Sequence, residues 1–267
     1  MRLKIEHHTR YEFAEPAGYG LQQLRLTPKS REGQTVLSWK TDIDGGTKEA
    51  SFVDQYNNQT LLVSVTPGIT CLNVTAHGEI ETEDKAGVVG KHGGCTPLWL
   101  YLRDTPLTKP GPTIRRIAKS LGSDFENEVA SMHCLMALIK SEVSYETGMT
   151  DAKTTGEEAA SAGHGVCQDH THIFIAAARL LGLPARYVSG YLMMNDRVQQ
   201  DASHAWAEVY VENLGWVGFD VSNAISPDAR YVAVATGLDY RDAAPISGLS
   251  IGPGAENLEV SVQVQQQ

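Results

Sequence analysis

Ala162-Gly-His-Gly-Val-Cys-Gln-Asp-His-Thr-His-Ile-Phe-Ile-Ala-Ala-Ala-Arg-Leu-Leu181 joins a short turn-forming segment to a long apolar one. The apolar side chains after Cys167 recur at helical spacing, and Gly182 and Pro184 end the pattern. We therefore predict a buried helix whose first turn carries Cys167. The positive end of a helix dipole favours a thiolate over a thiol, so a cysteine placed there can act as a nucleophile. The alternative for Cys167 alone is an inert buried cysteine.

Period-two alternation replaces the helical pattern after Pro184 and predicts three strands: Ala185–Leu192, Ser203–Val211 and Trp216–Asp220. Glu212-Asn-Leu-Gly215 turns the chain between the last two, which predicts a hairpin. Helical patterns over residues 113–121 and 126–143 precede this sheet, and Thr155-Gly-Glu-Glu158 is a capping signal for a further short helix. Helices followed by an antiparallel sheet predict an α+β second domain.

The first 85 residues alternate between apolar and polar side chains in four short segments: Leu3–His7, Thr35–Trp39, Leu61–Val65 and Cys71–Thr75. Turn residues separate these segments, which predicts an N-terminal β-sandwich domain over residues 1–85. Residues 86–112 contain five glycines and four prolines, so we interpret them as a connector, with Trp99–Leu102 packed against one of the domains. The second domain is predicted to span residues 113–267, with a last strand at Leu258–Val264.

Composition limits the class of protein. The chain has 267 residues and a formal net charge of −10, and it lacks a Lys/Arg cluster, so we expect no nucleic-acid partner. No apolar run reaches the roughly 18 residues of a membrane helix, and the charged start does not look like a secretion signal. We expect a cytoplasmic protein with reduced cysteines and no membrane partner. The oligomeric state stays open.

Two residues of the predicted hairpin can support a nucleophile at Cys167. A thiolate needs a base that exchanges its proton and a third group that orients the base. His204 opens one strand and Asp220 closes the other, and a turn centred at Glu212 places them directly opposite. Opposed residues have Cβ atoms about 4.5–5.5 Å apart, close enough for an imidazole–carboxylate hydrogen bond. A turn centred between Asn213 and Leu214 would instead shift the pair by three residues.

The chain resembles the bacterial transglutaminase-like proteins, which are often described as cysteine proteases. The second domain carries the resemblance in four motifs: Gly165-Val-Cys-Gln-Asp169, Leu183-Pro-Ala-Arg-Tyr-Val-Ser-Gly-Tyr191, Ser203-His-Ala-Trp-Ala-Glu-Val-Tyr210 and Gly215-Trp-Val-Gly-Phe-Asp220. The N-terminal segment adds three more: His8-Thr-x-Tyr11, Leu24-Arg-Leu-x-Pro28 and Gly33-Gln34. The resemblance therefore covers most of the chain.

The resemblance implies a papain-like core in which Cys167 is the nucleophile, His204 the base and Asp220 the orienting acid. It implies acyl transfer on a peptide or other amide, through a thioester, with no cofactor and no metal. The backbone N–H of Cys167 is the natural first donor to the oxyanion, and Tyr145 lies where related enzymes place an aromatic second donor. Gln168 and Asp169 are expected to organise the first helical turn.

The chain departs from the family pattern in two places. The aspartate is usually followed by Pro-Thr-Asn, where this chain has Val221-Ser-Asn223, and Gly237-Leu-Asp-Tyr240 lacks the arginine usual at its second position. A substrate contact from that arginine is therefore in doubt.

Two other functions compete with the enzyme. One is a zinc site built from His164, Cys167, His170 and His172. The other is a binding or scaffold protein that keeps the fold without activity.

Overall fold

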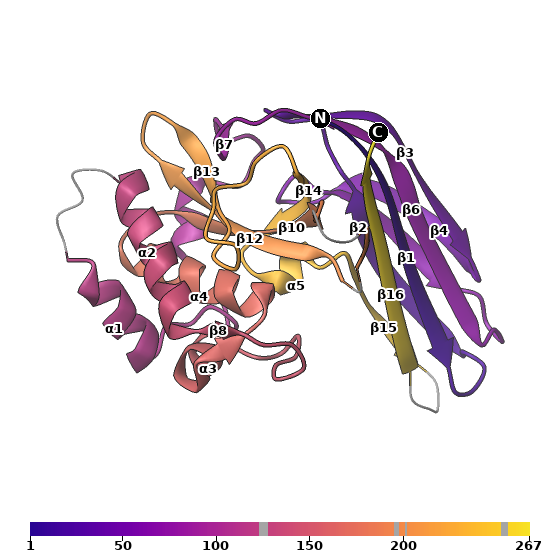
Figure 1. Cartoon of the computed structure of the whole chain (residues 1–267). Helices are drawn as coiled ribbons and strands as arrows, with labels where there is room; N and C mark the ends of the chain where they lie inside the picture. Colours follow the sequence, from indigo (N-terminus) through magenta and orange to yellow (C-terminus); the bar gives the residue numbers. More distant parts are fainter. Residues whose placement is uncertain (123–127, 195–197, 201, 252–255) are drawn as a thin grey trace.

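The computed structural model describes residues 1–122, 128–194, 198–200, 202–251 and 256–267. Helices and one sheet form a core, and two further sheets form a sandwich beside it (Figure 1). The fold is α+β, as the sequence predicts.

The sandwich consists of two antiparallel sheets. In strands such as β1, buried and exposed residues alternate because successive side chains point to opposite faces. The first sheet contains, in spatial order, β11 (Gln199–Gln200), β16 (Glu256–Gln266), β1 (Arg2–Phe13), β6 (Cys71–Thr82) and β3 (Gln34–Asp44). The second contains β15 (Ile246–Ile251), β2 (Tyr19–Thr27), β5 (Gln59–Val65) and β4 (Gly46–Val53).

The sequence predicts β1, β3, β5 and β6 but misses β2 and β4. No residue of β4 is fully buried, so this edge strand needs no apolar face and gives no alternating pattern. In β2 the buried positions include the polar side chains of Gln22 and Arg25, which hide the alternation. Both strands therefore lack the alternation of apolar and polar residues from which a strand is predicted.

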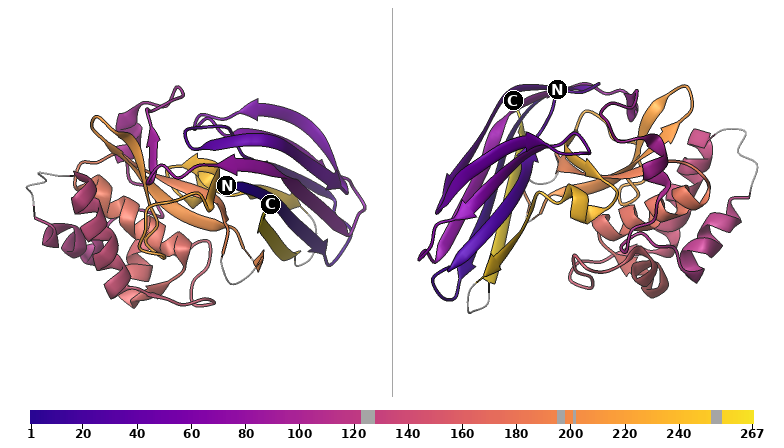
Figure 2. Two further views of the ribbon diagram at one scale, coloured as in Figure 1. Left: turned by 45° about the horizontal axis from the view of Figure 1, so that its top comes forward. Right: turned by 180° about the vertical axis from the view of Figure 1, so that it is seen from behind.

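The end of the chain returns to the sandwich, and the two termini lie side by side (Figure 2). β16 pairs with β1 along its whole length, and β15 pairs with β2. The predicted second domain, residues 113–267, therefore differs from the structure from Ile246 onward. Period-two alternation predicts a strand at Leu258–Val264 but cannot tell which strand it pairs with. The core is thus inserted into the sandwich, between β6 and β15.

The core sheet lies between the helices and the sandwich (Figure 1). Its strands, in spatial order, are β14 (Tyr231–Gly237), β10 (Ala185–Leu192), β12 (His204–Val211), β13 (Gly215–Phe219) and β7 (Val88–Gly90). Every residue of β10 is buried because both faces of the sheet are covered. On β12, Ala205 and Ala207 pack into the helical core, whereas Trp206 and Glu208 face the opposite side.

The helices surround α4, whose residues from Asp169 to Arg179 are all buried, so the predicted buried helix is confirmed. The helices are α1 (Pro112–Ser120), α2 (Glu128–Glu142), α3 (Gly156–Ala162), α4 (Cys167–Leu180) and the short α5 (Tyr240–Ala243). The predicted capping box of Thr155 and Glu158 begins α3. Residues 126 and 127 of the second predicted helix lie outside the described residues. No helix in the described ranges has the length and apolar character needed to cross a membrane.

The connector contributes to the core. Its strand β7 pairs with β13, and the 3₁₀ helix Leu98–Leu102 places the buried Tyr101 ring 5.1 Å from the ring of Trp216, centroid to centroid. The predicted packing is confirmed for Tyr101 and is wrong for Trp99 and Leu102, which are 60% and 38% exposed.

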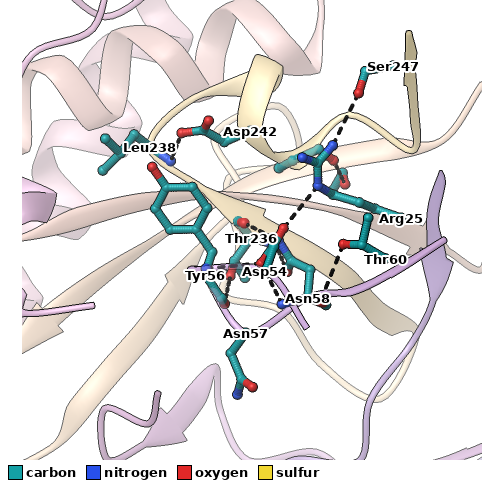
Figure 3. A network of polar contacts seen from close by, with 12 residues as sticks. Arg25, Asp54, Tyr56, Asn57, Asn58, Thr60, Thr236, Leu238, Asp242 and Ser247 are labelled. Carbon is teal, nitrogen blue, oxygen red and sulfur yellow. Dashed lines mark hydrogen bonds and ion pairs between the residues drawn. The ribbon is translucent and has the colours of Figure 1, made fainter. Parts of the chain in front are cut away.

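Side-chain amides of the sandwich cover the free edge of the core sheet. Asn58 donates to the carbonyl of Thr236 and accepts from its N–H, both at 2.8 Å, and Gln34 makes the same pair of hydrogen bonds to Ala233, at 2.9 and 2.8 Å. Buried Asp54 holds Asn58 in place and is itself paired with Arg25 (Figure 3). These amides take the position of a neighbouring strand along β14, which limits pairing with other chains.

A buried carboxylate also links the two domains. Glu208, on β12, is fully buried and accepts from Arg31 of the sandwich at 2.7 Å and from Arg186 of β10 at 2.7 Å. The guanidinium of Arg186 also stacks over the ring of Trp216 at 4.1 Å. Burial alone would raise the pKa of Glu208, but the two guanidinium groups outweigh burial and hold that pKa below its ordinary value.

Candidate active site

Cys167 is the first residue of α4 and is half-buried. Buried Asp169, two residues later, accepts hydrogen bonds from the N–H of Val166 at 2.8 Å and from the hydroxyl of Thr150 at 2.7 Å. The predicted role of Asp169 in organising the first turn is therefore confirmed, whereas Gln168 makes only a long contact, 3.5 Å from the carbonyl of Asp151. The first N–H groups of a helix have no partner within it, so the N–H of Cys167 is available to an oxyanion.

His204 and Asp220 lie together, as the sequence predicts. The ring Nε2 of His204 is 2.6 Å from Oδ2 of Asp220, and both side chains are buried. The predicted strand register is nevertheless wrong by two residues. In the structure Ala207 pairs with Phe219 and Val211 with Gly215. Extending this register makes His204 and Asp220 diagonal neighbours, and in a regular sheet such neighbours lie about 7–8 Å apart, a gap that an imidazole can span.

Two further donors hold the Asp220 carboxylate. The hydroxyl of Tyr231 and the side-chain amide of Asn223 each donate to Oδ2 at 2.7 Å, and the N–H of Asn223 donates to Oδ1 at 3.2 Å. Burial alone would raise the pKa of Asp220, but the hydrogen bonds from His204, Asn223 and Tyr231 outweigh it and lower that pKa. Sequence reasoning missed both donors. Asn223 lies three residues after Asp220, within reach of a local turn, but no sequence signal connects Tyr231 to the site.

Replacing Tyr231 with phenylalanine is expected to lower the free energy of unfolding at pH 7 by about 1.5–3 kcal/mol, because a buried carboxylate loses a donor. Asp220 has a lowered pKa, so its stabilisation exists above the unfolded pKa of about 3.9 and is lost as the pH falls through the folded value. The difference between Tyr231→Phe and wild type should therefore shrink toward pH 3. Urea unfolding at several pH values measures it, with Tyr19→Phe, at an exposed tyrosine, as control. A difference that does not change with pH would contradict the assigned contact.

His204 also contacts Cys167, so one imidazole joins the sulfur to the carboxylate. Burial alone would lower the pKa of His204, but hydrogen bonds to Asp220 and Cys167, and the charges of both groups, outweigh burial and raise that pKa to about 10. The ring is therefore positively charged at neutral pH. A charged imidazole next to a sulfur atom favours the thiolate, the reactive form of a cysteine.

Tyr145 lies on β8 (Ser144–Tyr145), which pairs in parallel with β9 (His164–Gly165) just before Cys167. Tyr145 is 54% exposed, and its ring meets the ring of His170 edge-on, with 6.1 Å between centroids. Its position in the chain fits the predicted second oxyanion donor, and that role stays a prediction.

The histidines around Cys167 point to different partners. His170 is bound to the hydroxyl of Ser222 at 2.9 Å and to the carbonyl of Val143 at 3.1 Å. Fully buried His172 accepts from the N–H of Tyr240 at 3.2 Å. In the described part of the chain, no three His, Cys, Asp or Glu side chains are placed to share a metal ion. This geometry does not favour the alternative zinc site.

One of the two departures from the family pattern lies next to the site, and the other lies elsewhere in the core. Ser222 replaces the usual threonine and binds His170, while the retained Asn223 binds Asp220. Leu238 stands where the family has arginine, and its carbonyl accepts from the buried side chain of Arg179 at 2.7 Å. The expected arginine side chain is replaced by an apolar one at this position.

Two family models match the chain. The transglutaminase-like superfamily matches residues 115–221, and the bacterial transglutaminase-like N-terminal region matches residues 3–81. An uncharacterized protein of Mycobacterium leprae is 27% identical over 98% of each chain. An uncharacterized protein of Mycobacterium bovis is 28% identical over 98% of this chain and 91% of its own.

A solved structure has the same overall fold. The crystal structure of a protein from Cytophaga hutchinsonii, named a putative cysteine protease, superposes with a TM-score of 0.77. It covers 100% of this chain and 91% of its own, at 21% identity. At this identity the comparison establishes the fold.

Proposed function

Because the chain belongs to the bacterial transglutaminase-like superfamily, we propose that it is a thiol-dependent enzyme that transfers the acyl group of a peptide or other amide. The observation that carries the proposal is the chain of contacts from Cys167 through His204 to Asp220. Each residue type in it has a chemical task in acyl transfer.

In the proposed reaction the thiolate of Cys167 attacks the amide carbonyl, and a C–S bond forms. The N–H of Cys167 stabilises the negative charge on the oxygen, with Tyr145 as the proposed second donor. The imidazolium of His204 gives its proton to the amine as the C–N bond breaks, which leaves a thioester. Water or a second amine then attacks the thioester while His204 accepts a proton from that nucleophile, and the C–S bond breaks to release the acyl product and restore the thiolate of Cys167. The first acceptor gives hydrolysis and the second gives transamidation.

Asp220 has a positioning role in this mechanism. It accepts from Nε2 of His204, which leaves Nδ1 of the ring to face the sulfur. Tyr231 and Asn223 fix the carboxylate, so the imidazole has one orientation. This orientation favours proton transfer to a group bound at Cys167.

The direct test is acylation by an activated ester, which needs no knowledge of the natural substrate. With p-nitrophenyl acetate, the thiolate attacks the carbonyl, p-nitrophenolate leaves, and a thioester forms. Mass spectrometry of wild type is expected to find the acetyl group on Cys167 and not on the exposed cysteines Cys95 and Cys134. Release of acetate in buffer, compared with acetyl transfer to added glycine methyl ester, then shows which acceptor is used.

Cys167→Ala serves as the negative control, and Cys134→Ala is the matched control at an exposed position. Acetylation of Cys167 at the same rate as Cys134 would contradict an activated thiol. The binding or scaffold alternative would then be the better description of this protein.

A further inference from the structure

A cavity of about 140 Å³ lies where the sandwich meets the core. β1 lines it with His7, Thr9 and Tyr11, and strands β15 and β16 supply apolar side chains, including Leu258. The core contributes Ser203 and other residues.

The position of this cavity follows from the way the first sandwich sheet is covered. At one end of its inner face, Leu3 and Ile5 pack against the core residues Tyr191 and Val232. At the other end, Tyr11 packs inside the sandwich. The cavity lies between these two contacts. There the inner face of the first sandwich sheet stops packing against the core and starts packing against the second sandwich sheet.

Two lining residues connect the cavity to the proposed active site. Ser203 directly precedes His204 in the chain. Tyr240 packs in the same cluster as Cys167, and its pKa is raised first by burial and then by the nearby charge of Cys167. The cavity therefore borders the site on the side of the sandwich.

The cavity is uncharged. His7 is its one titratable nitrogen base; it is buried and bonded to the hydroxyls of Tyr191 at 2.9 Å and Thr9 at 3.1 Å. Burial, aided by His8, lowers the pKa of His7 to about 4, so its ring is neutral at pH 7. None of the other described lining residues is acidic or basic in this range. A charged side chain placed there would lose water without gaining a counter-charge.

We propose that this cavity binds an uncharged, apolar side chain of the acyl-donor substrate, of the size of leucine or phenylalanine. The inference rests on the proposed function, which supplies the acyl donor. An apolar cavity of about 150 Å³ accommodates a benzene ring, so the observed volume suits one side chain and not a whole ligand. The sandwich domain then determines which amides reach Cys167, because β1, β15 and β16 form most of the cavity wall.

Chloromethyl ketones test the proposal on the intact protein, because the thiolate forms a C–S bond and displaces chloride. Two series, N-acetyl-X and N-acetyl-X-glycyl chloromethyl ketone, present the side chain X next to the reactive group or one residue away. Inactivation by Leu and Phe reagents is expected to be at least about tenfold faster than by Glu and Lys reagents in one series. Equal rates for all four side chains in both series would overturn the proposal.

A charge switch at the mouth of the cavity sharpens the test. Leu258 lines the cavity yet is 51% exposed, so the strand should tolerate a charge there. Leu258→Glu is expected to favour the Lys reagent over the Glu reagent by about fivefold to tenfold, and Leu258→Arg to do the reverse. Asn257→Glu and Asn257→Arg, on the adjacent exposed residue of β16, are the matched controls and should leave the preference unchanged.

Iodoacetamide separates failure of this proposal from failure of the proposed function, because it is too small to need the cavity. Fast alkylation of Cys167 without a side-chain preference would overturn the specificity proposal alone. Slow alkylation, like that of an ordinary thiol, would overturn both. An equal change of preference in the Leu258 and Asn257 variants would also overturn the assignment of the cavity.

Discussion

Replacing His204 with alanine is expected to slow alkylation of Cys167 by iodoacetamide at pH 6 by about 100-fold. A free thiol, with a pKa of about 8.5, is less than about 1% thiolate at this pH. In wild type, His204 has a raised pKa and contacts the sulfur, and a neighbouring positive charge favours the reactive thiolate over the thiol. The thiolate of such a pair is intrinsically somewhat less nucleophilic, which limits the gain. The rate for each cysteine is measured by mass spectrometry of its peptide.

Raising the pH toward 10 should affect amide turnover and alkylation of Cys167 differently. His204 has a pKa of about 10 in the folded protein, above its unfolded value of about 6.5, so its contribution to stability is complete below pH 6.5 and is lost as the pH rises toward 10. Amide turnover should fall over the same alkaline range, because the leaving amine needs the imidazolium proton. Alkylation needs no such proton and should persist. Parallel loss of both rates would contradict the role given to His204.

His8→Ala is the matched control for this experiment. His8 lies on β1, its side chain is 45% exposed, and it contacts Glu6 and Thr75 instead of a cysteine. Its replacement should leave the alkylation profile of Cys167 unchanged. A His204→Ala protein that folds and keeps the wild-type profile would show that the thiol is activated in some other way, or not at all.

Replacing Glu208 with glutamine is expected to lower the free energy of unfolding by about 3–5 kcal/mol. The carboxylate is fully buried between the guanidinium groups of Arg31 and Arg186. The glutamine amide lacks the negative charge that pairs with both Arg31 and Arg186. Because Arg186 has little access to water, its charge is then left poorly compensated. Denaturant unfolding at pH 7 measures the loss. Glu12→Gln, which removes a half-exposed ion pair with Arg10, is the control and should cost no more than about 1 kcal/mol.

Acid should reduce the effect of Glu208→Gln. The pKa of Glu208 is lowered in the folded protein, so its stabilisation is present above the unfolded pKa of about 4.3 and is lost as the pH falls through the folded value. The two proteins should therefore approach equal stability in strong acid. A cost below about 1 kcal/mol at pH 7 would mean that the arginines find other partners or water once the carboxylate charge is gone.

Much of the fold could be predicted because burial leaves a periodic pattern. The helix that begins at Cys167 could be predicted from the helical spacing of its apolar residues, and the strand Ala185–Leu192 from its period-two alternation. β4 was invisible because it is exposed on both faces. The return of β16 to β1 could not be predicted, because strand pairing between distant segments depends on tertiary packing and leaves no local signal.

The candidate site was predictable to the level of residue types and partners. Cysteine, histidine and aspartate in this order suggested the contacts, and His204 and Asp220 do meet, although by a diagonal contact that the predicted register did not foresee. Tyr231 reaches Asp220 from a separate strand, so its contribution required the structure. The cavity beside Ser203 required it as well, because three sandwich strands from both ends of the chain form its wall.

The insertion of the core between β6 and β15 also governs the order in which the protein can complete its fold during synthesis. β1 leaves the ribosome before the core does, and its partner β16 follows only after residues 14–255 have been made. At about 5–20 residues per second, β1 waits roughly 12–50 s for that partner. During this interval one edge of β1 has no strand beside it, and such edges pair readily with other chains. The core, with its β14 edge, can therefore fold before the sandwich is completed by the pairing of β16 with β1.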